Sequence, residues 1–150
     1  MSKKFQVDAL SMINNPEHKL RTYALMKTEI GLENYLSVVK NVSIRTQFSK
    51  FRLSDHNLEI EKGRHRGIDA EQRFCPFCKD KVENEIHFLL ECPLYKELRE
   101  IDPVFQVDNP GLSESERCVF LVSKGPQIAP FIQKLFELRN FFLSFPKRTQ

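Results

Sequence analysis

CPFCKDKVENEIHFLLEC, residues 75–92, decides how the middle of this chain folds. It holds three of the four cysteines and one of the four histidines, spaced Cys75-x2-Cys78-x8-His87-x4-Cys92. Thiolate and imidazole are ligands that a tetrahedral zinc ion prefers. Four protein ligands leave no open coordination position, so the pattern predicts a structural zinc site and not a catalytic one.

A proline follows both the first and the last of these cysteines. Pro76 biases Cys75 away from helical dihedrals and fixes its own φ, which suits a tight turn between Cys75 and Cys78. Pro93 acts on Cys92 in the same way. The sequence therefore predicts a change of chain direction at each end of the site.

Residues 82–90, VENEIHFLL, predict a short helix that carries His87. If this helix continued through Cys92, the two side chains would point about 140° apart around its axis. They can share one ion only if the helix ends before Cys92, and Pro93 supplies that end.

Two other interpretations fit the same residues. In one, the cysteines are free thiols and His87 is a partly buried helix residue. In the other, Cys75 and Cys78 form a thiol–disulfide redox pair, although the βαβ pattern typical of such pairs is missing. Because the chain starts without a secretory signal, we expect an intracellular protein, nuclear or cytoplasmic, where clustered cysteines more often bind metal.

The composition is that of an ordinary globular protein, with 150 residues, 41% hydrophobic and 29% charged. Thirteen Phe against five Gly and no Trp favour packed helices over a glycine-turned sheet. No run approaches the roughly 20 apolar residues of a membrane span. We therefore predict one mainly α domain over residues 1–150, with a zinc-binding segment at about 74–101 inside it.

Apolar residues at helical spacing predict helices within 17–27, 32–39, 44–51, 113–123 and 128–142. Ser43 and Ser113 are the predicted caps of two of them, and Ser113 with Glu116 matches a capping box. Residues 54–73 and 102–112 are predicted connections, because glycines or prolines interrupt them.

Three stretches of this sequence resemble the C-terminal side of the reverse transcriptases of non-LTR (LINE-type) retrotransposons. They are KFRLSDHNLEIEKGR (50–64), RFCPFC (73–78) and ENEIHFLLECPLYKELR (83–99). The similarity to the Cys-Cys-His-Cys zinc-binding region of that family, and to animal proteins derived from it, is clearest over residues 44–101. The resemblance implies the ligands Cys75, Cys78, His87 and Cys92 and a role in binding template RNA or target DNA.

The residues that a polymerase needs are not found in this sequence. A reverse transcriptase holds its metal ions with paired aspartates, whereas the aspartates here, at 8, 55, 69, 80, 102 and 108, are never adjacent. No nucleophile–base pair can be named either. We therefore predict an accessory nucleic-acid-binding module of retrotransposon origin, with no enzymatic activity and no small-molecule substrate.

Basic residues before the cysteine segment are the candidates for phosphate contacts. Residues 1–74 carry 13 Lys and Arg against 9 Asp and Glu, whereas residues 75–101 carry 4 against 6. Binding of RNA or single-stranded DNA would therefore depend on the earlier stretch. The predicted nucleic-acid-binding residues are Lys50, Arg52, Lys62, Arg64, Arg66 and, for stacking on an unpaired base, Phe77. The other interpretation is a solvated surface interrupted by Glu59 and Glu61.

The alternative function is a zinc-stabilised protein–protein interaction module. Residues 128–145 form a broad, Phe-rich apolar stripe, which in most proteins is core. A stripe this broad could also dock a protein partner or form a homodimer. We further expect His56 at the surface and Cys118 as a buried thiol.

Overall fold

The computed structural model describes residues 19–27, 31–106 and 111–145. Its elements are α2 (Arg21–Met26), α3 (Asn34–Val38), α4 (Val42–Arg52), α5 (Glu59–His65), η1 (Ala70–Gln72), η2 (His87–Glu91), η3 (Pro93–Tyr95), α6 (Lys96–Ile101), η4 (Pro103–Phe105), α7 (Glu114–Ser123) and α8 (Ala129–Ser144). Within these ranges, the only β pairing outside the helices is a single bridge between Phe74 and Val82. The predicted mainly α fold is confirmed. None of the described helices is both long and apolar enough to cross a membrane.

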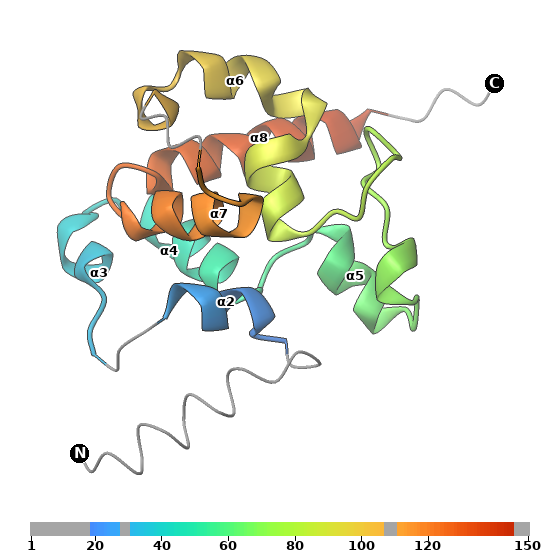
Figure 1. Ribbon diagram of the computed structural model, residues 1–150, viewed down its shortest axis with the longest axis horizontal. Helices are drawn as coiled ribbons and strands as arrows, with labels where there is room; N and C mark the ends of the chain where they lie inside the picture. The colour runs from blue at the N-terminus through green and yellow to red at the C-terminus, as the bar shows by residue number, and fades with distance from the viewer. Residues whose placement is uncertain (1–18, 28–30, 107–110, 146–150) are drawn as a thin grey trace, which may run out of the picture.

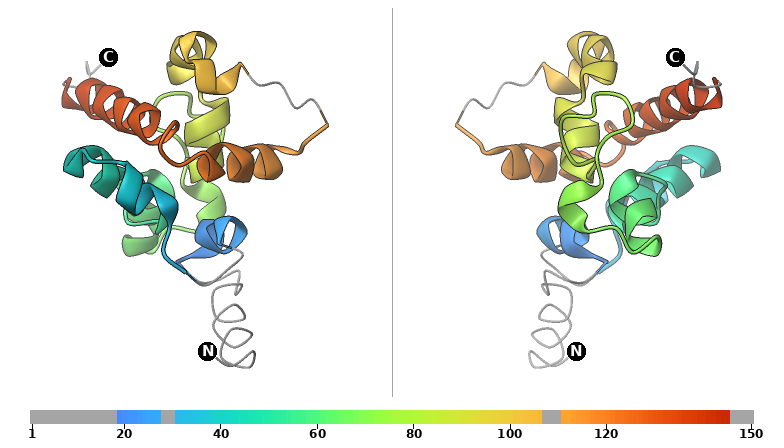
Figure 2. Two further views of the ribbon diagram at one scale, coloured as in Figure 1. Left: turned by 90° about the vertical axis from the view of Figure 1, so that its left-hand side faces the viewer. Right: turned by 90° about the vertical axis from the view of Figure 1, so that its right-hand side faces the viewer.

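The core forms where α4 and α8 pack side by side, the largest contact between two helices (Figures 1 and 2). Phe51 of α4 and Phe136 of α8 are buried there. Phe88 comes from the cysteine segment, and its ring centroid lies 4.5 Å from that of Phe136 and 6.1 Å from that of Phe51. The helical turn of the cysteine segment is thus the third element that packs in the core, beside α4 and α8.

The predicted helix around residues 44–51 is α4, but its cap differs from the prediction. The Asn41 side chain accepts a hydrogen bond from the backbone N–H of Ile44, so Asn41 and not Ser43 begins the helix. Both residue types are good caps. Asn41 prevails because its extended backbone, φ −68° and ψ 114°, directs its side chain at the free N–H groups.

The capping box of α7 is confirmed. Ser113 Oγ accepts from the N–H of Glu116, and the Glu116 carboxylate accepts from the N–H of Ser113. Cys118, four residues into this helix, is buried as expected, and burial raises the pKa of its thiol to about 12. It is an inert core residue.

The prediction of a loop throughout residues 54–73 is wrong, because Glu59–His65 form helix α5. Ile60 is buried, and the helix has acidic residues in its first turn and basic residues in its last, as the helix dipole favours. Gly63, which suggested a break, lies under the side chain of Arg73. A Cβ at Gly63 would stand 2.5 Å from Arg73 Cγ. Glycine at position 63 therefore leaves room for the Arg73 side chain and does not end the helix.

Candidate metal centre

The four predicted ligands converge. One ligand atom from each of Cys75, Cys78, His87 and Cys92 lies within 4.8 Å of every other. Cys75, Cys92 and His87 are almost completely buried, and Cys78 is partly exposed. Residues up to 17 apart in sequence therefore form one compact group of metal-ligating atoms.

Two separations inside this cluster fit a tetrahedral ion. Cys75 Sγ and Cys92 Sγ are 3.8 Å apart, and Cys78 Sγ and His87 Nε2 are 3.5 Å apart. A tetrahedron with metal–sulfur bonds of about 2.3 Å and metal–nitrogen bonds of about 2.0–2.1 Å separates two sulfurs by about 3.8 Å, and sulfur from nitrogen by about 3.6 Å. These two separations match a tetrahedral Cys₃His site, and all pairs of the four ligand atoms lie within 4.8 Å.

The first two ligands lie on a tight turn. The N–H of Lys79 donates to the carbonyl of Cys75 at 3.0 Å, and the N–H of Cys75 donates to the carbonyl of Lys81 at 2.8 Å. Lys79 has φ of +57°, a left-handed conformation that reverses the chain so that Phe74 and Val82 can pair. Such a conformation costs about 1–2 kcal/mol outside glycine. The turn is thus held at its base by backbone hydrogen bonds.

A π-helical turn positions the other two ligands. The N–H of Cys92 donates to the carbonyl of His87 at 2.8 Å, five residues back. This wider turn brings His87 and Cys92 toward the same side of the axis, which an α-helix would not do. Cys92 then leaves the helix with φ −57° and ψ 125°, before Pro93, as predicted.

The predicted start of this helix at residue 82 is wrong. Val82 belongs to the bridge with Phe74, and helical structure begins at residue 85. The Asn84 side chain accepts from the N–H of His87 at 2.8 Å. Of the residues predicted to be helical, Val82 therefore lies on the second side of the turn, and Asn84 caps the helix that follows.

A carboxylate outside the cluster orients the imidazole. His87 Nδ1 lies 3.3 Å from Glu91 Oε2, and Lys81 Nζ lies 3.3 Å from Glu91 Oε1. Donation from Nδ1 to a carboxylate leaves the lone pair of Nε2 free to bind a metal. Glu91 is therefore a positioning residue for the ligand His87.

Hydrogen bonding among the ligands shifts their proton affinities. The bond with Cys92, together with burial, raises the pKa of Cys75 to about 12, and the same bond lowers the pKa of Cys92. Burial alone would lower the pKa of His87, but hydrogen bonding to Cys75, the nearby thiols and Glu91 outweigh it and raise that pKa. The cluster holds protons that a bound cation would displace.

Two buried carboxylates beside the cluster join it to the rest of the fold. Glu83 accepts from Nε and Nη2 of Arg139 in α8, both at 2.8 Å, and from the N–H of Glu59 at 2.7 Å. Both members of the Glu83–Arg139 ion pair are almost fully buried. The metal-binding segment is therefore fastened to α8 and to the start of α5.

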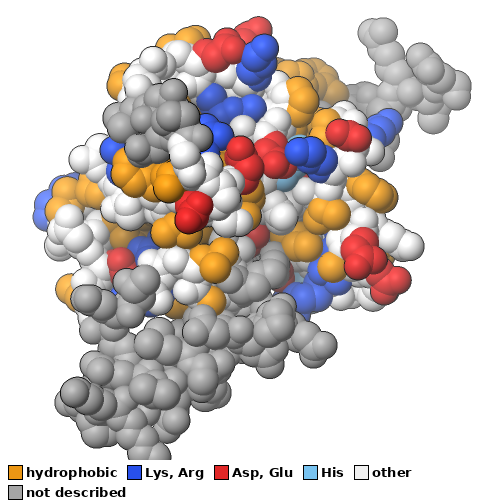
Figure 3. Space-filling view, viewed as in Figure 1, with side chains coloured by type: hydrophobic (Ala, Val, Ile, Leu, Met, Phe, Trp, Pro, Cys, Tyr) orange, Lys and Arg blue, Asp and Glu red, His pale blue; other side chains and the backbone are white. Residues whose placement is uncertain are grey.

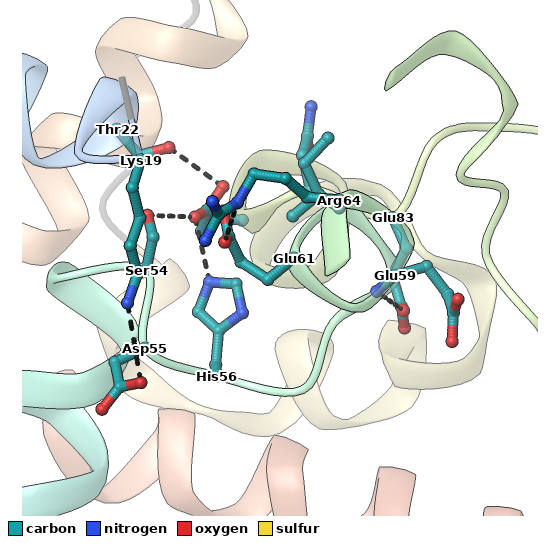
Figure 4. A network of polar contacts seen from close by, with 12 residues as sticks. Lys19, Thr22, Ser54, Asp55, His56, Glu59, Glu61, Arg64 and Glu83 are labelled. Carbon is teal, nitrogen blue, oxygen red and sulfur yellow. Dashed lines mark hydrogen bonds and ion pairs between the residues drawn. The ribbon is translucent and has the colours of Figure 1, made fainter. Parts of the chain in front are cut away.

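Glu85 makes the second connection. It accepts hydrogen bonds from Thr22 in α2 at 2.9 Å, from Ser54 at 2.7 Å and from His56 Nε2 at 2.9 Å. Figure 4 labels these three donors. The expectation that His56 lies at the surface is wrong, because its side chain is fully buried in this network. The sequence offered no signal for this pair, since the two residues are 29 positions apart.

Arg52 does not lie where a phosphate contact requires it. It is 5% exposed, pairs with Glu33 at 3.0 Å, and stands over the rings of Tyr23, Tyr35 and Phe48. The prediction that Arg52 binds nucleic acid is therefore wrong, because the guanidinium is used inside the fold.

The other predicted phosphate contacts lie nearer the surface. Lys62 and Arg66 pair with Glu59, at 3.4 and 3.5 Å, and Arg64 pairs with Glu61 at 2.9 Å. Lys50 is exposed beside a hollow of about 290 Å³. On the face shown in Figure 3, the basic and acidic side chains of the described residues are interspersed.

Phe77, the predicted stacking residue, belongs to a group of four aromatic rings that we call the ring cluster: Phe77, Phe141, Phe142 and Phe145. Phe77 is partly buried against the core, and its centroid is 6.5 Å from that of Phe142. Phe141 lies 5.6 Å from Phe142 and 4.9 Å from Phe145. The ring cluster thus joins the turn of the metal site to the end of α8.

Comparison with known proteins adds no relative. No protein-family model, curated protein or solved structure matches this chain. The resemblance to the LINE-type zinc-binding region stays a prediction that rests on the quoted residues alone. The site is a Cys₃His group whose four ligand atoms lie close enough together to hold a metal ion.

Proposed function

We propose that this protein is a zinc-stabilised interaction module. In this proposal one zinc ion binds Cys75, Cys78, His87 and Cys92 and fixes the turn that carries Phe77. The ring cluster is the surface that the module presents to a protein partner. With all four positions of the ion taken by protein ligands, its role is structural.

The choice of zinc is supported by the chemistry of the ligands. Three thiolates and one imidazole in a tetrahedron form one of the usual structural zinc sites. Metal ions that prefer oxygen ligands or a higher coordination number need a different set of ligands. The ligand separations agree with zinc bond lengths. Glu91 supports the imidazole as a carboxylate does in many zinc sites.

The exposure of the ring cluster carries the proposed role in interaction. Phe141, Phe142 and Phe145 are 56%, 42% and 54% exposed although they contact one another. Contiguous apolar surface of this kind marks interaction sites, whereas scattered exposed apolar residues do not. Aromatic residues are also the ones enriched in protein interfaces.

Nucleic-acid binding stays a weaker proposal. Arg52 is buried, and three of the remaining basic residues, Lys62, Arg64 and Arg66, pair with glutamates of α5. Affinity for a phosphate backbone rests on cations free to replace its counterions. Among the predicted basic contacts, Lys50 alone forms no ion pair with another described residue.

Photo-crosslinking tests the proposal. A benzophenone amino acid replaces Phe145 in one variant and Leu143 in a control; Leu143 is 39% exposed on the same helix, about 160° around its axis from residue 145. After expression in cells, position 145 should give discrete protein adducts, and position 143 far fewer. Equal labelling from both positions would contradict the ring cluster as the interaction surface.

Zinc and nucleic acid are measured on the same protein. Native mass spectrometry of the reduced chain should find one zinc ion, which a chelator removes. Titration with labelled RNA and single-stranded DNA at rising salt should show no saturable binding. Salt-sensitive binding that survives substitution of the ring cluster, and fails when Lys50 is changed, would support the nucleic-acid function instead.

A further inference from the structure

We propose that Arg99 is the counter-cation of the metal centre: its guanidinium balances the excess negative charge of the three thiolates and so sets how tightly the metal is bound. This role rests on the zinc site of the proposed function and deepens it. Arg99 lies in α6, a helix that contains none of the four ligands.

The guanidinium of Arg99 reaches back to the last ligand of the cluster. Arg99 Nη2 donates to the carbonyl oxygen of Cys92 at 2.6 Å, across seven positions of the sequence. The carbonyl oxygen and the Sγ of one cysteine are four bonds apart, and so no more than about 5 Å from each other. Cys92 Sγ in turn lies within 4.8 Å of the other three ligand atoms. The positive charge of Arg99 is therefore close to the whole centre.

The acidic residues beside the cluster have cations of their own. Lys81 pairs with Glu91 at 3.3 Å, and Arg139 pairs with Glu83 at 2.8 Å. Among the described residues, Arg99 has no ion-pair partner, and its Nη1 is buried without a hydrogen bond. Burial of a charged group is costly unless an opposite charge compensates for it. Arg99 is thus a partly buried cation that no described carboxylate neutralises.

The metal centre has the opposite charge. Three thiolates and a divalent ion leave one net negative charge, because the imidazole ligand is neutral. Water and salt screen a partly buried cation such as Arg99 less than an exposed one such as Lys79, which follows Cys78. We therefore expect Arg99 to raise the affinity for zinc and to make the bound thiolates less reactive.

The zinc affinities of three variants of the full chain, measured by competition with a chromophoric chelator, test this role. Arg99→Gln keeps a donor for the Cys92 carbonyl but removes the charge, and should lower the affinity about tenfold or more. Arg99→Lys keeps the charge and should recover most of the affinity. Lys96→Gln is the control, because it removes a positive charge from an exposed position of the same helix, where Lys96 pairs with Glu100 at 3.8 Å. It should change the affinity by less than about twofold.

Alkylation of the zinc-loaded chain gives a second measurement, which a purely structural role of Arg99 would not change. Iodoacetamide labels the cysteines, and mass spectrometry of the peptides gives a rate for each one. In Arg99→Gln the ligand cysteines should react about threefold faster, because a nearby cation lowers the basicity of a thiolate and with it the nucleophilicity. Labelling of Cys118, which is buried outside the cluster, should stay slow and reports any unfolding.

The outcomes separate this role from the function on which it rests. A wild-type chain that binds no zinc removes the proposed function, and Arg99 loses its role with it. If the wild type binds one zinc and Arg99→Gln binds it equally tightly, the zinc site stands and the role of Arg99 is overturned. Equal losses in Arg99→Gln and Arg99→Lys overturn it as well, because the charge would then not matter. If circular dichroism shows that Arg99→Gln is unfolded, the lysine variant decides alone: affinity near that of the wild type supports the role, and a loss of about tenfold overturns it.

Discussion

Arg139 of α8 and Glu83 of the metal-binding segment form a buried ion pair with two parallel hydrogen bonds, each 2.8 Å long. The residues are 56 positions apart, and neither is exposed. Glu83 also accepts from the N–H of Glu59, so one carboxylate connects α8, α5 and the turn that holds two ligands. The cysteine segment and the core are therefore connected through one buried carboxylate.

Removing the arginine should destabilise the whole domain. Arg139→Ala leaves the Glu83 carboxylate buried without its cation, and breaking such a pair from one side costs about 3–5 kcal/mol. Urea unfolding of the zinc-saturated protein measures the change. Arg117→Ala is the matched control, because Arg117 pairs with Glu114 at 3.0 Å on the exposed surface of α7 and such pairs contribute at most about 1 kcal/mol. Equal effects of the two substitutions would show that burial of the pair is unimportant.

Loss of one ligand should remove both metal and structure. Cys92→Ser is expected to bind no zinc at neutral pH and to lose much of its helix signal in circular dichroism, because metal affinity adds to folding free energy. We expect a chelator to have the same effect on the wild type. Cys118→Ser is the control: this cysteine is equally buried, in α7, outside the cluster. It should keep one zinc per chain. A Cys92→Ser chain that stays folded with zinc bound would exclude Cys92 as a ligand.

The sequence was sufficient to predict which four side chains come together, because local features bring them close. Pro93 ends the helix before Cys92, and the Cys-x2-Cys spacing brings the first two thiols together, so the four ligands could be named before their distances were known. The π turn could not be predicted. Its hydrogen bond joins Cys92 to the carbonyl five residues back, and one such bond leaves no periodic signal in the sequence.

Three of the errors, at Arg52, Gly63 and His56, share one physical cause, which is tertiary contact between residues distant in sequence. Arg52 resembled a phosphate contact because its neighbours are basic, but Glu33 and three aromatic rings hold it inside the fold. Gly63 resembled a helix breaker until Arg73, ten residues later, was found to cover it. His56 resembled a surface residue until Glu85 was found beside it. Local propensity gives no information about such partners.

Acid should weaken the contact between Glu33 and its two cations. Burial opposes ionisation of Glu33, but hydrogen bonds from Arg52 and Lys27 lower its pKa below the ordinary value of 4.5. A carboxyl with a lower pKa in the folded state stabilises that state above its unfolded pKa, and loses this effect as the pH falls through the folded pKa. The urea midpoint of Glu33→Gln should therefore lie below that of the wild type at pH 7, and the gap should shrink below about pH 4.5.

The comparison for Glu33 is a difference between two proteins, so loss of zinc in acid affects both alike. Glu114→Gln, which removes an exposed i,i+3 pair with Arg117, is the control and should show a small gap at every pH. A gap between wild type and Glu33→Gln that stays constant from neutral to acid pH would contradict an ionised role for this carboxylate.

Glu91 should tune zinc affinity without touching the ion. In the wild type, His87 Nδ1 lies 3.3 Å from the Glu91 carboxylate. Glu91→Gln keeps a side-chain oxygen at this position but removes the negative charge that makes the imidazole a stronger ligand. Replacement of such supporting groups typically costs about 10–100-fold in affinity. Competition with a chromophoric chelator should therefore give an affinity at least about tenfold lower, still with one zinc per chain. Lys81→Ala removes only the outer contact to Glu91 and should have a smaller effect. Unchanged affinity in Glu91→Gln would mean that the backbone alone orients His87.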